Sequence, residues 1–306
     1  MKTKLVPVSI TSFAVSLLLL AAPSTSRADD LYVSNAGDNT INKFNSSGVG
    51  TVFATAASGL RNPQGLAFDS SGNLYVANYN GQFIQKYNSS GVGTRFSSTY
   101  PAPEGIAFNS AGFLYLAAYH GLSDGIIQTF DSSGVGSAFA VTPLLLSEGL
   151  AIDKSDNFFV AGTLNSWEGV ILKYTPSGAG SVFAGGMAWP TGLAFDGAGN
   201  LYVSHVSQDI GTITKYDPNG VGTVFATGLS SPTGLAFDSA GNLFVCEQGS
   251  GTIKKYTPDG VGTVFASGLN SPWGLAIQVP EPSTWSLMAL GILALLGGMR
   301  LRRRSS

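Results

Sequence analysis

The sequence has few charged residues and almost no cysteine or histidine. Lys, Arg, Asp and Glu make up 11% of the 306 residues, and the formal net charge is −2. Nucleic-acid-binding proteins normally carry a strong basic patch, so this balance argues against a nucleic-acid partner. Cys246 is the only cysteine, which excludes an intramolecular disulfide and a metal site built from several cysteines. Its apolar surroundings predict a small core side chain.

Common catalytic and nucleotide-binding motifs are missing as well. The two histidines, His120 and His205, are expected in different repeat units, so the sequence offers no Ser-His-Asp set. Its GLSDG segment at 121–125 matches the Gly-x-Ser-x-Gly pattern but stands among short strands and lacks the strand-turn-helix context of a nucleophile elbow. The recurring GVGTVF segment lacks the lysine of a phosphate-binding loop.

Both ends of the chain have the pattern of processing signals. Lys2 and Lys4 precede an apolar run at 13–22, and residues 26–28 fit a small-x-small cleavage site. This run is about half as long as a transmembrane helix needs to be. The sequence therefore predicts a secretory signal peptide over residues 1–28 and an exported domain over residues 29–278.

Residues 279–306 form the second signal. A Pro-Glu-Pro motif at 280–282 is followed by apolar residues from 285 to 299 and by arginines at 300 and 302–304. An apolar helix of this length spans roughly 23 Å, so we expect a short transmembrane helix. The arginines should stay in the cytoplasm and the domain should lie on the far side of the membrane.

This tail resembles the PEP-CTERM sorting signal of Gram-negative bacteria. The resemblance implies an exosortase partner that cuts near the Pro-Glu-Pro motif, often in species that make exopolysaccharide. It also implies a protein anchored in the inner membrane, on the periplasmic side, before it is sorted to the cell surface or released. A GPI signal would end in apolar residues rather than in arginines, and an ordinary permanent anchor is the simpler alternative.

A short pattern recurs along the whole exported domain. The segment GLAFDSAGNLFV at 234–245 has close copies beginning at Gly65, Gly105, Gly149 and Gly192, and a half copy, GLAIQ, begins at Gly274. The second strand of each unit begins at Leu31, Leu74, Leu114, Phe158, Leu201 and Leu243. A period of 40–44 residues with four short strand-like segments per unit is typical of β-propeller blades.

The two ends of the domain predict a closed ring. The exported chain opens on a second strand near Leu31 and stops after a lone first strand at 274–278. Three strands from one end and one from the other complete a blade. We therefore expect an all-β, six-bladed β-propeller with four antiparallel strands per blade, closed by the C-terminal strand. An open solenoid would need polar capping repeats, and the sequence shows none.

The repeat, over roughly residues 30–278, resembles NHL-repeat propellers and, more loosely, the gluconolactonase and senescence-marker family and virginiamycin B lyase. Such propellers host unrelated activities, so the resemblance implies the fold more strongly than the chemistry. Gluconolactonase-like enzymes draw Glu, Asn and Asp metal ligands from the position before the first-strand glycine.

One face of the expected propeller varies between units, while the other repeats. The turns after the first and third strands are nearly identical, as in DSSGN and SSGVG, whereas the opposite connections differ. We predict the ligand-binding face at these variable connections. Its inner ring, just before each first-strand glycine, is Gln64, Glu104, Glu148, Thr191, Thr233 and Trp273. Its outer ring, at the end of the second strands, includes Asn35, Asn78, His205 and Glu247.

Glu104 and Glu148 belong to adjacent units and are the candidate metal ligands. Two neighbouring carboxylates can share a proton or hold a hard divalent cation such as Ca²⁺. Thr191 and Thr233 stand where the gluconolactonase pattern has further strong ligands. The alternative is a pair of solvated carboxylates at the rim, which the sequence favours.

Three tryptophans of the exported domain, Trp167, Trp189 and Trp273, fall in the variable connections. Exposed aromatic rings stack on sugars or contact partner loops, although rings beside prolines also pack loops onto a fold. The first hypothesis is a surface propeller that binds a glycan or protein partner, linked to exopolysaccharide or biofilm. The second is a metal-dependent hydrolase or lyase of the gluconolactonase or virginiamycin B lyase type, and the third is an envelope scaffold without a ligand.

Overall fold

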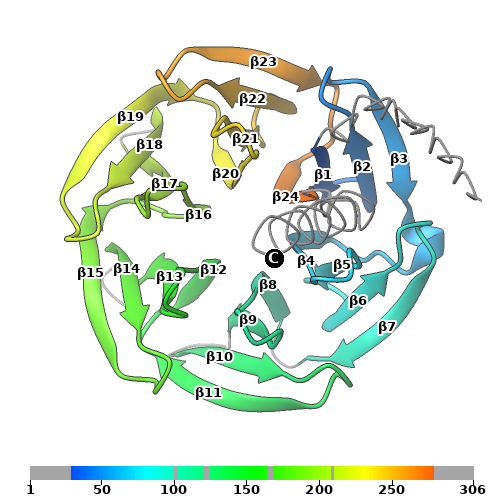
Figure 1. The fold of residues 1–306 in the computed structure, drawn as a ribbon, viewed down its shortest axis with the longest axis horizontal. Helices are drawn as coiled ribbons and strands as arrows, with labels where there is room; N and C mark the ends of the chain where they lie inside the picture. Colours follow the sequence, from blue (N-terminus) through cyan, green and yellow to red (C-terminus); the bar gives the residue numbers. More distant parts are fainter. Residues whose placement is uncertain (1–28, 100–101, 120–123, 165–167, 208–209, 279–306) are drawn as a thin grey trace, which may run out of the picture.

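The chain folds into a ring of six four-stranded antiparallel sheets (Figure 1). The computed structural model describes residues 29–99, 102–119, 124–164, 168–207 and 210–278. This confirms the predicted six-bladed propeller with four antiparallel strands per blade. The signal peptide and the transmembrane helix predicted for residues 1–28 and 279–306 lie outside the described residues. Among the described residues, no helix has the length and apolarity to cross a membrane.

Each blade has four strands, which we number from the channel outward as the first to the fourth strand. The first, innermost strands are β24 (Pro272–Gln278), β4 (Pro63–Phe68), β8 (Ala102–Phe108), β12 (Leu146–Ile152), β16 (Leu193–Phe195) and β20 (Pro232–Phe237). The second strands are β1 (Asp30–Asn35), β5 (Leu74–Asn78), β9 (Leu114–Tyr119), β13 (Phe158–Thr163), β17 (Leu201–Ser207) and β21 (Leu243–Glu247).

The two outer positions complete each blade. The third strands are β2 (Thr40–Phe44), β6 (Phe83–Tyr87), β10 (Gly125–Phe130), β14 (Gly169–Tyr174), β18 (Ile210–Tyr216) and β22 (Thr252–Tyr256). The fourth strands are β3 (Gly50–Ala54), β7 (Gly93–Ser98), β11 (Gly136–Thr142), β15 (Gly180–Met187), β19 (Gly222–Leu229) and β23 (Gly262–Ser267), and a 3-10 turn, η1 (Ala56–Ser58), follows β3. Blade 1 is β24 with β1–β3, and blades 2 to 6 follow in chain order.

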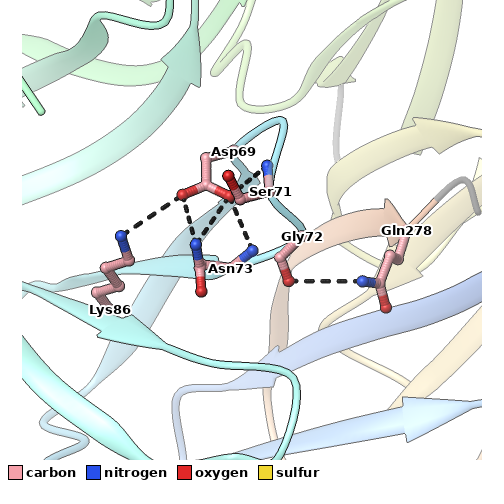
Figure 2. Close-up of polar contacts among 6 residues, drawn as sticks. All are labelled: Asp69, Ser71, Gly72, Asn73, Lys86 and Gln278. Carbon is pink, nitrogen blue, oxygen red and sulfur yellow. Dashed lines mark hydrogen bonds and ion pairs between the residues drawn. The ribbon is translucent and has the colours of Figure 1, made fainter. Parts of the chain in front are cut away.

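The ring is closed by its last strand, as the sequence predicts. β24 pairs antiparallel with β1, with Leu31 opposite Ile277 and Asp30 opposite Gln278. The Gln278 side chain donates from Nε2 to the carbonyl of Gly72 in blade 2 at 3.5 Å (Figure 2). Gln278 therefore belongs to blade 1 and is also hydrogen-bonded to blade 2.

The two faces of the ring differ in how their turns are built. We call the face with the turns after the first and third strands the turn face, and the opposite face, with the other two connections of each blade, the variable rim. On the turn face, Asp69 Oδ1 accepts the backbone N–H groups of Ser71 and Asn73 at 3.0 and 2.8 Å (Figure 2). Turns at Asp153, Asp196 and Asp238 repeat these bonds. These are Asx turns, in which the aspartate serves its own backbone.

Aromatic rings fill the space between blades. The Tyr75 ring lies edge-on to Phe96 of its own blade and to Phe108 of the next, with both centroid distances 4.9 Å. Lys86 Nζ lies 5.1 Å from the same ring and 3.6 Å from Asp69 Oδ2 (Figure 2). Edge-to-face pairs of this kind add to the burial of apolar area. Because the arrangement recurs around the ring, the sheets bury both faces against one another.

Candidate functional site

A ring of glycines brings the innermost strands together around the channel. A Cβ on Gly65 would overlap the backbone carbonyl of Glu104, and one on Gly274 would overlap that of Gln64. The glycines at 105, 149, 192 and 234 meet the next blade in the same way. Only a residue without a side chain permits this approach, which is the physical reason for the repeated glycine in the sequence.

This packing holds the inner-ring side chains around one small cavity at the channel. Its volume is about 80 Å³, and its lining includes Glu104, Glu148, Thr191, Thr233 and Trp273. The structure therefore brings five of the six predicted inner-ring residues together at one cavity. Gln64 is buried at the equivalent position of blade 2, beside Gly65, which also lines the cavity.

The carboxyl group of Glu104 has an incomplete set of partners. Its side chain is only 5% exposed, and Oε2 is buried with no hydrogen-bond partner. Burial, with a further contribution from the charge of Glu148, raises the pKa of Glu104 well above its usual value. Burial also raises the pKa of Glu148 to about 7. Both groups therefore take up protons far more readily than exposed carboxylates.

The other side of the cavity is occupied by hydroxyl groups that bond to backbone. Thr191 Oγ1 donates to the carbonyl of Pro232 at 3.0 Å, and Thr233 Oγ1 donates to the carbonyl of Trp273 at 3.0 Å. Ser204 Oγ accepts the Gly192 N–H at 2.8 Å and donates to the Thr233 carbonyl at 2.6 Å. These hydroxyls join blade 5 to blade 6 and blade 6 to blade 1, and their protons are used in these bonds.

Sequence reasoning did not identify the serines that take part in these joints. Ser34 Oγ donates to the Gln64 carbonyl at 2.6 Å and accepts the Gly274 N–H at 2.8 Å, so it ties the closing strand to blade 2. The signal is faint, because the fourth residue of the second strand is serine in two units and alanine or cysteine in the others.

Two predicted tryptophans lie on the variable rim. Trp273 is partly buried and lines the cavity. Trp189, between β15 and β16, is 45% exposed and has a backbone φ of +47°. The residues before the corresponding prolines in other blades, Asn62, Ser231 and Ser271, share this left-handed conformation. A bulky residue is uncommon there. Trp167 lies outside the described residues.

The predicted outer-ring residues are all buried at the ends of the second strands. Glu247 Oε1 lies 3.1 Å from Lys254 Nζ and accepts the Ser230 N–H at 2.9 Å, while Oε2 accepts the Thr252 hydroxyl at 2.9 Å. His205 is 7% exposed and bonds to Thr214 Oγ1 at 2.9 Å. Burial lowers the pKa of His205, so the imidazole is neutral at pH 7.

The two asparagines of the outer ring also serve the fold. Asn78 Oδ1 accepts the Arg61 N–H at 2.7 Å, and Asn35 Nδ2 donates to Asn42 Oδ1 at 2.7 Å. The outer ring thus supports the loops of the variable rim, and the inner ring faces the cavity.

Family models match two short parts of the chain. An NHL repeat matches residues 60–87, the segment that contains β4 to β6. The PEP-CTERM protein-sorting motif matches residues 278–304. This second match indicates export and a C-terminal sorting signal. That signal anchors the chain at the membrane and implies processing by an exosortase.

Solved structures show the same fold. The chain is similar to virginiamycin B lyase from Staphylococcus aureus (17% identity, 80% of this chain and 84% of that chain, TM-score 0.58). It is also similar to a gluconolactonase from Xanthomonas campestris (16%, 68% and 77%, 0.57). A third similar structure is the calcium-binding protein regucalcin from Agrobacterium tumefaciens (18%, 69% and 76%, 0.57). No curated protein matches the chain. At these identities the likeness concerns the fold alone.

Proposed function

We propose that this protein is held at the inner membrane by its C-terminal tail, is then sorted to the cell surface, and binds a glycan across the mouth of the channel on its variable rim. One observation carries the proposal: a partly exposed tryptophan, Trp273, and a carboxyl group without a complete set of partners, that of Glu104, line the same cavity. Sugar recognition uses this pairing, because the ring stacks on the apolar face of a sugar and the carboxyl group binds hydroxyls.

The size of the cavity limits how a glycan binds. A volume of about 80 Å³ accommodates a few water molecules, not a whole sugar ring. The glycan therefore lies across the mouth, stacks on Trp273, and inserts one hydroxyl or hydroxymethyl group toward Glu104 and Glu148. Trp189 supplies a second aromatic surface on the same rim. It keeps the left-handed backbone that Asn62, Ser231 and Ser271 have at the equivalent positions.

The test is binding of the purified propeller to an array of bacterial glycans. We expect Trp273→Ala to weaken binding by about tenfold or more, the usual effect of removing a central aromatic anchor. Val221→Ala, on the turn face, is the matched control and should bind as the wild type does. Equal binding by the Trp273 variant would contradict the proposal. Capture of a protein ligand in place of any glycan would move the function to the protein-binding alternative.

A second candidate, a metal-dependent hydrolase or lyase, is favoured by the unpartnered Oε2 of Glu104 beside Glu148. Ca²⁺ takes six to eight oxygen ligands, and the described residues contain no cluster of three or more His, Cys, Asp or Glu side chains. The hydroxyls of Thr191 and Thr233 donate to carbonyls, which leaves their oxygen lone pairs as acceptors. The two carboxyl groups alone supply fewer ligands than Ca²⁺ takes, so a bound ion would need further oxygen ligands from hydroxyls, backbone carbonyls or water.

Thermal denaturation with and without Ca²⁺ tests this candidate. A metal that binds only the folded state raises the melting temperature as its concentration exceeds its Kd. The enzyme hypothesis expects such a rise for the wild type and its loss in Glu104→Gln with Glu148→Gln. No rise in the wild type would remove its main support.

A further inference from the structure

Both ends of the described chain lie on the turn face. Asp29 Oδ2 accepts the backbone N–H of Ser239, in the turn after β20, at 2.6 Å. At the other end, Gln278 bonds to Gly72, in the turn after β4 (Figure 2). Gln278 is also the first residue of the matched sorting motif. The anchoring tail therefore begins on the turn face, next to the innermost strands.

The tail gives the propeller little freedom to turn away from the membrane. The apolar stretch begins at residue 285, and a fully extended chain covers at most about 3.5 Å per residue. The end of β24 is therefore within roughly 25 Å of the start of the apolar stretch. A tether of this length holds the turn face at a high effective concentration near the bilayer.

The turn face also presents a repeated set of exposed apolar side chains. The turns between third and fourth strands carry a valine in five of six blades, and these valines are 62–67% exposed: Val49, Val92, Val135, Val221 and Val261. Alanine stands at the sixth position, 179. Because these turns are equivalent in each blade, the five valines form a ring of separate apolar side chains around this one face.

The valine turns are rigid, so that contact with a surface would cost little conformational entropy. In the first of them, the Asn45 N–H donates to the Val49 carbonyl at 3.1 Å, and Asn45 Oδ1 accepts the Val49 N–H at 3.0 Å. The same two bonds recur at Asn88, Asp131 and Asp217.

The charge of this face favours a neutral surface over an anionic one. Asp131 and Asp217 are partly exposed, and hydrogen bonds within their turns, from Ser133 and Val221 respectively, lower their pKa values. They are therefore ionised at neutral pH, and like charges on lipid headgroups would repel them.

We propose that, while the tail is attached, the turn face lies on the lipid headgroups of the membrane, with the valine turns in contact and the variable rim pointing away. This orientation rests on the membrane anchoring in the proposed function. It leaves the glycan-binding rim open to the cell envelope and places the Pro-Glu-Pro motif between the propeller and the bilayer.

The full chain, reconstituted in phosphatidylcholine vesicles, provides the test. Cys246 is fully buried, and burial raises the pKa of its thiol, so added cysteines can be labelled selectively. Val221→Cys places a polarity-sensitive fluorophore on the turn face, and Ser230→Cys places the matched control on the variable rim. We expect spin-labelled lipids to quench the label at 221 at least several-fold more strongly than the label at 230, and anionic lipid to reduce that quenching.

An alkaline wash of the vesicles tests the anchoring separately, because it removes proteins that are only adsorbed. If the chain stays with the washed vesicles but the two labels are quenched equally, or neither is quenched, the orientation is overturned and the anchoring stands. Loss of the chain from the vesicles in alkaline buffer would overturn the anchoring and the orientation together. Crosslinking of two chains through residue 221, without quenching, would assign the valine surface to a second copy and overturn the lipid contact. Glycan binding by the rim is measured independently of all three.

Discussion

The two halves of the channel mouth use the same glycine contacts and differ in what surrounds them. In blades 5, 6 and 1, the hydroxyls of Thr191, Thr233 and Ser204 bond across the joints to backbone groups. In blades 3 and 4, carboxyl groups take the positions of the threonines, and Oε2 of Glu104 has no partner. We call these the hydroxyl half and the acidic half.

This difference suits the hydroxyl half to stabilising the ring and the acidic half to binding a ligand. Buried polar groups are usually paired, and in the hydroxyl half the pairing is internal. In blades 2 to 4, the second-strand position of Ser34 and Ser204 is occupied by the fully buried alanines Ala77, Ala117 and Ala161, which cannot bridge a joint. An unsatisfied buried group costs stability, and a ligand that donates a hydrogen bond to Oε2 of Glu104 would offset that cost.

The largest expected effect comes from adding one methyl group to each half. In Gly192→Ala, the new Cβ overlaps the Thr233 carbonyl and lies 2.8 Å from Ser204 Oγ, whereas in Gly105→Ala it meets Leu150 N at 2.8 Å and the Glu148 carbonyl at 2.9 Å. Overpacking against backbone costs about 1–3 kcal/mol. We expect the free energy of unfolding, measured in urea, to fall by about 3 kcal/mol for Gly192→Ala and about 1 kcal/mol for Gly105→Ala. Equal losses would show that the closer approach of Gly192 to the next blade does not make this position the more sensitive of the two.

The second effect is a pH dependence confined to the acidic half. The pKa of Glu148 rises from 4.5 to about 7 on folding, so the folded state binds more protons between these values and stability falls as the pH rises through them. The full shift corresponds to about 3 kcal/mol, and the partial exposure of Glu148 reduces this to about 2 kcal/mol. Urea unfolding at pH 5 and pH 8 measures the loss.

Glu148→Gln should remove the part of this pH dependence that Glu148 contributes and leave the part from Glu104, whose pKa burial also raises. It should make the protein more stable than the wild type at pH 8. Thr191→Ser keeps the hydroxyl and the glutamates, so it should retain the wild-type slope. An unchanged slope in Glu148→Gln would mean that Glu148 titrates as an exposed carboxylate does. An unchanged slope in Glu104→Gln with Glu148→Gln would extend this to the pair, which is the simpler hypothesis from the sequence.

The fold could be predicted from the sequence because each blade repeats the same local pattern of strand and turn residues. The glycine at 65 and its equivalents, the Asp-to-Asn turns and the lone strand at 274–278 each have a local cause, and together they define six blades and their closure. The gathering of the inner ring followed from this topology. The hydrogen bonds of the inner ring could not be predicted in this way, because glutamate and threonine at the same position both look like polar residues of the rim. Only packing shows that Thr233 bonds to two carbonyls while Oε2 of Glu104 bonds to none.

The smallest expected effect comes from removing a single hydroxyl group in the hydroxyl half. Thr233→Val keeps the shape of the side chain and loses the bonds from Oγ1 to the carbonyls of Pro272 and Trp273, at 3.2 and 3.0 Å. One buried hydrogen bond contributes about 1 kcal/mol, which lowers the melting temperature of a domain of this size by about 2–4 °C. Thr233→Ser retains the hydroxyl and should lose less. Because the effect acts through the joint between blades 6 and 1, glycan binding at saturating ligand should not change. A Thr233→Val variant that melts normally but no longer binds would instead place this hydroxyl in the binding site.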